Sequence, residues 1–388
     1  MKIGIEAQRI FREKKHGIDI VAIELIRSLQ ILDTENEYYI FCNAKNAKVS
    51  SIFLDVPSNF HFIQKSSSNY ATWEQVHLPK LADKYNLDLL HCTANTAPLA
   101  LSIPLILTLH DIIYLEKMDF LGGSLYQRIG NLYRRFIVPQ IIHRCEKIGT
   151  VSNFEKDKIA DYFNIPDSKL KTYYNASSDY FEVIEDKSIV QQFLQQNELP
   201  EQYIMLFGSE DPRKNTENSI IAYAEYVRNS LAEEIHPLVI VDIEKDYYKN
   251  IIKRNNLQDV DEYIITKQYI SNFDLKYIYN GASLFLFLST RESFGIPILE
   301  AMACGTPVLT STLSSLPEVA GDAAVLVNPL DKSNISVNIN LILSDEDLRS
   351  RLIEKGLKRS LDFNWKFTAE KWLDTYRSCL KQKMVAEK

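Results

Sequence analysis

Residues 283–310, SLFLFLSTRESFGIPILEAMACGTPVLT, constrain the fold more than any other stretch. They begin with an apolar run at 283–290 that is short enough for a strand buried on both faces. A polar turn at 291–295 follows, and Pro297 stands where the first turn of a helix accepts proline. Gly305 is a natural left-handed end for that helix, and another apolar run opens the next strand. This order predicts a parallel α/β sheet.

The turn and helix of this stretch carry groups that suit an anionic sugar ligand. Glu292 falls in the loop after the strand, and Glu300 is expected in the first turn of the helix. The N–H groups of Ser293, Phe294 and Gly295, with the helix dipole, would form an anion site. Glu300 could accept hydrogen bonds from two sugar hydroxyls, and ligands of open parallel sheets bind at this edge. The spacing of these residues alone is explained equally well by an ordinary strand–helix–strand crossover with no ligand site.

The sequence around these carboxylates is more specific than their spacing. RESFGIPILEAMACGTPVLTSTLSSLPEVAGDAA resembles the E-x7-E signature of family-4 retaining glycosyltransferases, including the FG-x-P interior, the EAMACG-x-PV tail and the later PE-x-x-GDAA. The resemblance implies the GT-B fold, an α/β architecture of two Rossmann-like domains facing each other across a cleft. It also implies that Glu292 and the amides of Phe294 and Gly295 position the donor sugar. Glu300 would then hold the ribose hydroxyls.

Chain length agrees with two domains, because 388 residues suit two units of roughly 150–200 residues each. A polar, helix-compatible segment ending at Pro200 marks the place where the chain passes from the first domain to the second. We therefore expect two domains, at 1–180 and 195–365. The resemblance implies that the first is the acceptor-side domain and that the second binds the nucleotide sugar. By resemblance to GT-B proteins, a last helix at about 366–388 should cross back to the first domain.

Two residues of the first half are site candidates. Gly17 stands before a predicted helix at 21–32, and His110 closes a predicted strand, IPLILTLHD. From its local sequence, Gly17 could be an ordinary loop glycine. His110 could be a loop histidine whose ring nitrogens are hydrogen-bonded within the protein. The resemblance implies more, since a glycine loop in this family approaches the donor phosphates and the acceptor. A histidine followed by aspartate lies beside the donor sugar in the same family.

The second half offers a phosphate cradle after a predicted strand at 203–208. Arg213 and Lys214 stand in a loop just before a helix that starts at residue 216. A guanidinium can chelate oxygens and an ammonium adds a mobile charge, although basic loops are common on surfaces. The family carries a similar RKN loop here. The resemblance therefore implies that Arg213 and Lys214 hold the phosphates of the leaving group.

Net charge and composition limit the binding partners and the cellular compartment that we expect for this protein. The net charge of −7 gives no attraction to nucleic acid, and no apolar run is long enough to span a membrane. Residues 124–147 form a predicted helix with five Arg or Lys against one Glu, which would suit an anionic membrane surface, an acidic acceptor or plain solvent. Five scattered cysteines indicate free thiols. We expect a cytoplasmic protein, or one peripheral at the inner membrane surface.

Two D-x-D patterns, at 259–261 and 345–347, are the sequence's candidates for a metal site. Neither ends a buried strand, so we interpret both as structural and predict no metal and no cofactor. The hypothesis is retaining, metal-independent transfer of a hexose from a nucleotide diphosphate sugar to a saccharide or lipid-linked saccharide. A role in cell-surface polysaccharide or glycan synthesis follows from the resemblance. The alternatives are a catalytically silent nucleotide-sugar-binding GT-B subunit and a nucleotide-sugar epimerase.

Overall fold

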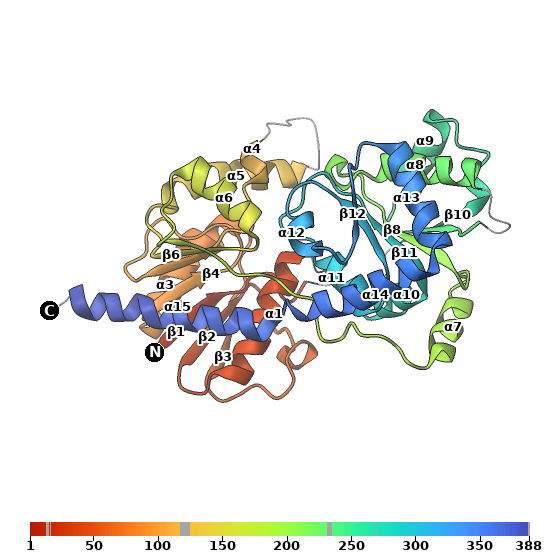
Figure 1. Ribbon diagram of the computed structural model, residues 1–388. Helices are drawn as coiled ribbons and strands as arrows, with labels where there is room; N and C mark the ends of the chain where they lie inside the picture. The colour runs from red at the N-terminus through yellow and green to blue at the C-terminus, as the bar shows by residue number, and fades with distance from the viewer. Residues whose placement is uncertain (13–14, 16, 117–124, 231–234, 269, 387–388) are drawn as a thin grey trace. The chain divides into compact units, whose positions relative to one another are not determined.

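A computed structural model describes residues 1–388 except 13–14, 16, 117–124, 231–234, 269 and 387–388. The chain divides into two compact units (Figure 1). The first unit contains Met1–Asn175 and Asn364–Lys388, and the second contains Ala176–Phe363. Each unit is an α/β domain built around its own parallel sheet.

The first unit has the strand order β3-β2-β1-β4-β5-β6-β7, with every neighbouring pair parallel. Since β1 pairs with both β2 and β4, the order reverses between β1 and β4, and such a switch point is where open α/β sheets bind ligands. The strands are β1 (Lys2–Glu6), β2 (Glu37–Cys42), β3 (Phe60–Gln64), β4 (Leu89–Cys92), β5 (Leu105–Thr108), β6 (Lys147–Thr150) and β7 (Leu170–Thr172). The α-helices are α1 (Gly17–Leu32), α2 (Tyr70–Thr72), α3 (Leu78–Tyr85), α4 (Ile113–Glu116), α5 (Leu125–Ile141), α6 (Asn153–Phe163) and α15 (Trp365–Ala386).

Helices cover both faces of the first sheet because its strands are apolar on both sides. Ile3 and Ile5 share a core with residues of α1 and α15. Leu90 and Leu107 belong to a separate core that includes residues of α3, α5 and α6. Alternate strand positions therefore feed opposite faces, as expected for a sheet buried between two layers of helices.

The C-terminal helix α15 is an integral part of the first unit. Its Trp372 ring stacks on Tyr173 with 3.6 Å between centroids, and Tyr376 reaches His91 of β4. His91 Nδ1 lies 2.8 Å from Tyr376 Oη, and His91 Nε2 lies 2.8 Å from Thr108 Oγ1. Burial lowers the pKa of His91 to about 3, so this histidine is neutral and serves as a structural hydrogen-bonding group.

The second unit has the strand order β10-β9-β8-β11-β12-β13, again parallel throughout, with its switch point between β8 and β11. The strands are β8 (Tyr203–Phe207), β9 (Leu238–Val241), β10 (Ile264–Lys267), β11 (Ala282–Phe287), β12 (Val308–Ser311) and β13 (Val325–Val327). The α-helices are α7 (Lys187–Gln196), α8 (Thr216–Asn229), α9 (Lys245–Arg254), α10 (Asn272–Gly281), α11 (Ile296–Ala303), α12 (Leu316–Ala320), α13 (Lys332–Ser344) and α14 (Glu346–Leu361).

The predicted strand–turn–helix–strand at residues 283–310 is confirmed as β11, α11 and β12, with one correction. Gly295 is left-handed, with φ of 114°, and α11 begins directly after it at Ile296. Glu300 is therefore the fifth residue of α11, and the prediction that it lies in the first turn is wrong. Gly305 is left-handed, with φ of 75°, and follows the last turn as predicted.

Both D-x-D patterns have structural partners in the described chain. Asp345 caps α14, because its side chain accepts a hydrogen bond from the Leu348 amide at 2.8 Å. Asp259 forms an ion pair with Arg228 at 2.7 Å, and Tyr248 donates a hydrogen bond to Asp261. These contacts agree with the structural interpretation of both patterns.

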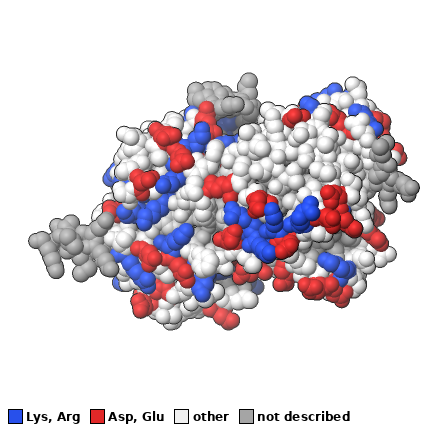
Figure 2. Space-filling model, viewed as in Figure 1, with Lys and Arg blue, Asp and Glu red and all other residues white. Residues whose placement is uncertain are grey.

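Basic side chains on α14 lie beside acidic ones. Figure 2 shows Lys and Arg gathered over α14 with Asp and Glu beside them, and the ion pairs of this helix include Lys355–Asp322 at 2.7 Å and Lys358–Glu354 at 2.6 Å. Among the described residues, no helix is both long enough and apolar enough to cross a bilayer. All five cysteines are free and buried.

Candidate functional site

The loop that carries Arg213 and Lys214 is held against the carboxyl end of β11. Asn215 is left-handed, with φ of 59°, and its side-chain amide donates to the Leu288 carbonyl at 3.0 Å and to the Pro329 carbonyl at 2.7 Å. The Thr290 amide donates to the Arg213 carbonyl at 2.8 Å. These bonds tie the loop after β8 to the loop after β11, across the switch point of the second sheet.

The two predicted phosphate-binding cations form ion pairs with carboxylates. Lys214 Nζ lies 2.7 Å from Glu292 Oε1, and the Arg213 guanidinium contacts both carboxylate oxygens of Asp211. Burial opposes ionisation of Asp211, but the hydrogen bonds and charge of Arg213 outweigh it and lower its pKa. Lys214 and Glu292, both predicted site residues, are thus in direct contact.

Ser314 and Ser315 fix the turn at 292–295 from the loop after β12. The Glu292 amide donates to Ser314 Oγ at 3.0 Å, and Ser315 Oγ donates to the Phe294 carbonyl at 2.8 Å. A Cβ on left-handed Gly295 would meet the Leu316 side chain at 2.8 Å, so this turn requires glycine. Phe294 is buried, and only its backbone can take part in an anion site.

One carboxylate oxygen of Glu300, a half-buried residue of α11, is hydrogen-bonded. Tyr279 Oη donates to Glu300 Oε2 at 3.0 Å, and Oε1 accepts no hydrogen bond from any residue that the structure describes. Burial raises the pKa of Glu300 to about 7, with the Tyr279 hydrogen bond acting in the opposite direction. A carboxylate in this state can accept hydrogen bonds from hydroxyl groups once it is ionised.

His110 lies in the first unit, directly after β5, and is buried. Its backbone amide donates to Asn95 Oδ1 at 2.6 Å, and Nε2 lies 2.8 Å from the Thr93 carbonyl. Since a carbonyl only accepts, Nε2 carries the hydrogen and Nδ1 is the acceptor nitrogen. Burial lowers the pKa of His110, so the ring is neutral near pH 7 with an available acceptor.

Gly17 is the other first-unit candidate and is the first residue of α1. It is exposed, and a Cβ added there would meet nothing within 4 Å. The predicted candidates thus fall into two groups. The group in the second unit comprises Arg213, Lys214, Glu292, Ser293, Phe294, Gly295 and Glu300, and the group in the first unit comprises Gly17 and His110.

Sequence reasoning missed four contributors to these groups. Asp211, Tyr279, Ser314 and Ser315 each bond directly to a predicted residue or to its backbone. Asp211 had a local signal, because an aspartate side chain in a turn often accepts a hydrogen bond from the backbone amide two residues on, as it does here from Arg213. Tyr279 and the two serines had no such signal, since their contacts join segments that are distant in sequence.

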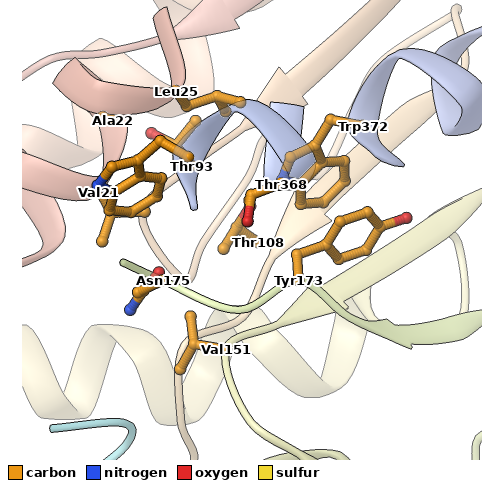
Figure 3. Close-up of a pocket in the computed structure, with 11 residues that line it drawn as sticks. Val21, Ala22, Leu25, Thr93, Thr108, Val151, Tyr173, Asn175, Thr368 and Trp372 are labelled. Carbon is orange, nitrogen blue, oxygen red and sulfur yellow. The ribbon is translucent and has the colours of Figure 1, made fainter. Parts of the chain in front are cut away.

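A small cavity of about 10 Å³ lies in the first unit at the carboxyl ends of β4 to β7. Figure 3 shows its lining, in which the rings of Trp372 and Tyr173 lie side by side and Thr93 and Thr108 supply hydroxyls. This volume is on the scale of a single water molecule. The cavity is therefore a gap in the packing between α1 and α15, and it is too small for a sugar.

Two family descriptions match the chain, and together they extend over most of it. "Glycosyltransferase Family 4" matches residues 16–177, and "Glycosyl transferases group 1" matches residues 190–359. The chain belongs to glycosyltransferase family 4. The resemblance carried by the Glu292–Glu300 segment is confirmed by these matches.

Individual relatives of this family-4 protein agree with the assignment. O-antigen chain mannosyltransferase B from Escherichia coli is 32% identical over 233 residues, which are 59% of this chain and 59% of that protein. Serotype-specific mannosyltransferase WbdA, also from Escherichia coli, is 28% identical over 277 residues, 70% of this chain but 33% of that protein. The match thus spans less than two thirds of either relative.

The fold agrees with a solved structure at lower sequence identity. Anabaena HepE in complex with UDP-glucose matches with a TM-score of 0.73 and 17% identity, covering 97% of this chain and 100% of that chain. The predicted GT-B fold class is confirmed.

Proposed function

We propose that this protein is a retaining, metal-independent glycosyltransferase. It transfers a hexose from a nucleotide diphosphate sugar to a hydroxyl of a saccharide or lipid-linked saccharide, in the synthesis of a cell-surface polysaccharide. The observation that carries the proposal is the Lys214–Glu292 ion pair at 2.7 Å. It joins a cation and a carboxylate from two neighbouring loops at the switch point of the second sheet, where a charged ligand is expected.

Departure of a nucleoside diphosphate leaves negative charge on the phosphate oxygens, and cations lower the energy of that state. Arg213 and Lys214 supply the charge. In the structure each cation is paired with a carboxylate, Asp211 for Arg213 and Glu292 for Lys214. A bound diphosphate would take over these cations and leave Glu292 free to hold a sugar hydroxyl. The carboxylates therefore keep the cations in position before the donor arrives.

The remaining candidates complete the proposed donor site. Glu300 accepts hydrogen bonds from the ribose hydroxyls, and the amides of Ser293, Phe294 and Gly295 bind phosphate or sugar oxygens. His110 accepts a hydrogen bond from a hydroxyl of the transferred sugar at Nδ1, because Nε2 is engaged with Thr93. Gly17 allows close approach of a ligand to the start of α1.

Mannose is the first sugar to test, because the two Escherichia coli relatives are named as mannosyltransferases. The experiment incubates the protein with GDP-mannose, UDP-glucose or UDP-galactose, with and without octyl α-mannoside, in buffer containing EDTA. We expect a glycoside product with retained anomeric configuration from one donor. Lys214→Met should lower the rate by about 10²–10³-fold, as for loss of one group that stabilises a developing anion. Exposed Lys249→Met on α9 is the matched control and should be neutral.

Other outcomes of this experiment would favour one of the alternative functions or contradict the proposed mechanism. A changed donor sugar without release of nucleoside diphosphate would indicate an epimerase. Donor binding without turnover in every combination would indicate a silent subunit. Dependence on an added divalent cation would contradict the metal-independent mechanism.

Helix α5 supports a weak contact with a membrane surface. Ile129, Leu132 and Phe136 are 60%, 67% and 64% exposed and share one helix face by their spacing of three and four residues. Exposed Arg128 lies next to this face and would favour anionic lipid. Sedimentation with phosphatidylglycerol vesicles should exceed that with phosphatidylcholine vesicles. Replacement of the three apolar residues by serine should abolish the difference, whereas equal sedimentation of wild type with both vesicles would contradict the contact.

A further inference from the structure

A pocket of the second unit lies between helices α8 and α13, away from the site candidates described above. The two helices pack side by side (Figure 1). The last turns of α8 and the first half of α13 line the pocket. Its volume is about 200 Å³, whereas one water molecule needs only about 10–15 Å³. A ligand the size of a sugar ring therefore has room to enter.

This pocket lies at the opposite edge of the second sheet from the donor loops. Helix α8 carries the chain back from the carboxyl end of β8 to the amino end of β9, because β8 and β9 are parallel. The 14 residues of α8 extend roughly 20 Å at a rise of about 1.5 Å per residue. Asn229, the last of them, is therefore far from the loop that carries Lys214. A ligand in this pocket occupies a second site, distinct from that of the nucleotide sugar.

Three polar side chains that line the pocket have hydrogen-bonding groups that the protein does not use. Asn229 and Asn340 are exposed, and their side-chain amides bond to no residue that the structure describes. Ser336 is only 5% exposed, yet its hydroxyl also has no partner in the described parts of the chain. This hydroxyl is not sealed in the core, because it is absent from the enclosed unpaired atoms and borders the pocket.

Ser219 of α8 shows how a buried helical serine is ordinarily satisfied. Its hydroxyl donates to the Asn215 carbonyl, four residues earlier, at 2.9 Å. Ser336 does not make the equivalent bond with Lys332. The contrast indicates that the Ser336 hydroxyl is available to a ligand.

The rest of the lining combines one carboxylate with apolar surface. Glu225 Oε2 accepts a hydrogen bond from Ser333 Oγ at 2.9 Å, and Oε1 accepts none from the residues that the structure describes. The hydroxyl of buried Tyr226 is hydrogen-bonded within the protein, which leaves its ring to line the pocket. Val337 is 64% exposed and adds an aliphatic surface. The lining thus has hydroxyl, amide and carboxylate groups beside apolar ones.

We propose that this pocket binds a neutral saccharide, a segment of the polysaccharide that the enzyme elongates. Sugar hydroxyls donate and accept hydrogen bonds, as amides and serine hydroxyls do, so Asn229, Ser336 and Asn340 can each bond to the ring. Glu225 Oε1 accepts from one further hydroxyl, and Val337 packs against the C–H groups of the ring. A few placed polar groups beside an apolar surface are typical of small-molecule sites.

The charge of the pocket disfavours an anionic ligand. No lysine or arginine is among the described residues that line it, and the Glu225 carboxylate would repel a phosphate. A second copy of the nucleotide sugar is therefore a poor ligand for this place. A cationic ligand would have Glu225 as its one ionic partner, and the experiment below distinguishes it from a saccharide.

The inference rests on the proposed function, because it takes the ligand to be a chain that the enzyme extends. A polysaccharide held in the pocket stays on the protein between transfers, so its end returns to the donor loops at a raised effective concentration. An acceptor too short to span the roughly 20 Å of α8 gains nothing. The pocket therefore raises the apparent affinity for long acceptors and leaves the chemical step unchanged.

A fluorescent label beside the pocket measures binding at this place. All five native cysteines are buried, so Leu341→Cys, at a 43% exposed position one turn after Val337, supplies one accessible thiol. The labelled protein is titrated with mannotriose, maltotriose and spermidine. We expect a saturable change with at least one trisaccharide and none with spermidine.

Variants of the labelled protein test the named groups. Asn229→Ala combined with Asn340→Ala should raise the dissociation constant about tenfold, as for the loss of two hydrogen bonds. Asn334→Ala is the matched control, because Asn334 is an exposed asparagine of α13 outside the pocket, and it should leave the constant unchanged. The inference is overturned if neither trisaccharide binds, if spermidine binds instead, if the double variant binds as tightly as its parent, or if Asn334→Ala weakens binding equally.

Transfer kinetics separate failure of this inference from failure of the proposed function. The double variant should have a KM for a hexamannoside acceptor about tenfold above that of wild type, with the same kcat and the same KM for octyl α-mannoside. Equal effects on the long and the short acceptor would contradict the inference. Absence of transfer from every donor overturns the proposed function instead, and the titration still decides whether the pocket binds a saccharide.

Discussion

Glu300 makes the affinity for a nucleoside diphosphate depend on pH. Its pKa is raised to about 7 by burial, and only the ionised carboxylate is a strong acceptor for two ribose hydroxyls. We therefore expect affinity to fall as the pH is lowered through 7. Glu300→Gln, which cannot ionise, should bind more weakly at pH 8 and lose this part of the pH dependence.

The size of the effect follows from the ionised fraction. With a pKa of about 7, roughly 90% of Glu300 is ionised at pH 8 and roughly 10% at pH 6. Because apparent affinity scales with the binding-competent fraction, the dissociation constant should rise about tenfold between these values. Tyr279→Phe removes a hydrogen bond that favours the carboxylate, which should move the transition to higher pH.

Isothermal titration at pH 6, 7 and 8 measures this effect for wild type, Glu300→Gln and Tyr279→Phe. A terminal phosphate itself titrates near pH 6, so each wild-type value is divided by the Glu300→Gln value at the same pH. Folding gives an independent readout. A raised pKa means that Glu300 contributes stability below its ordinary pKa of 4.5 that is lost as the pH rises towards 7. Identical pH slopes for wild type and Glu300→Gln would refute the reasoning.

Three further predictions concern the donor loops. Lys214→Met should raise the dissociation constant of the nucleoside diphosphate, measured by titration, and Glu292→Gln should not, because only the lysine carries the charge that phosphate needs. Gly295→Ala should destabilise the fold by about 1–3 kcal/mol in urea, since Ala would be left-handed and would touch Leu316, whereas Gly17→Ala should stay within about 0.5 kcal/mol. EDTA should leave the transfer rate unchanged, and a rate restored only by added Mg²⁺ or Mn²⁺ would contradict this.

The helices and strands around Glu292 and Glu300 could be predicted because the sequence features that define them are local. An apolar run, Pro297 near a helix start and Gly305 after its end define β11 and α11 within a few residues. The sequence does not show that α11 begins at Ile296, and Glu300 is therefore placed in the wrong turn of the helix. The left-handed conformation of Gly295 decides where the helix begins. Glycine allows that conformation but does not require it.

The polar partners of the site could not be predicted in the same way. The contact of Tyr279 with Glu300 and the contacts of Ser314 with Glu292 depend on packing between segments 21 to 22 residues apart.

The position of α15 has a consequence for the order in which the protein is made. The second unit is one continuous segment, Ala176–Phe363, whereas the first unit requires α15 from the end of the chain. While the ribosome is still translating, His91 and Tyr173 therefore lack the Tyr376 and Trp372 side chains that cover them. The unit synthesised first is the last to be completed. A nascent chain stalled before residue 365 should hold a folded second unit beside an incomplete first one, a natural client for chaperones.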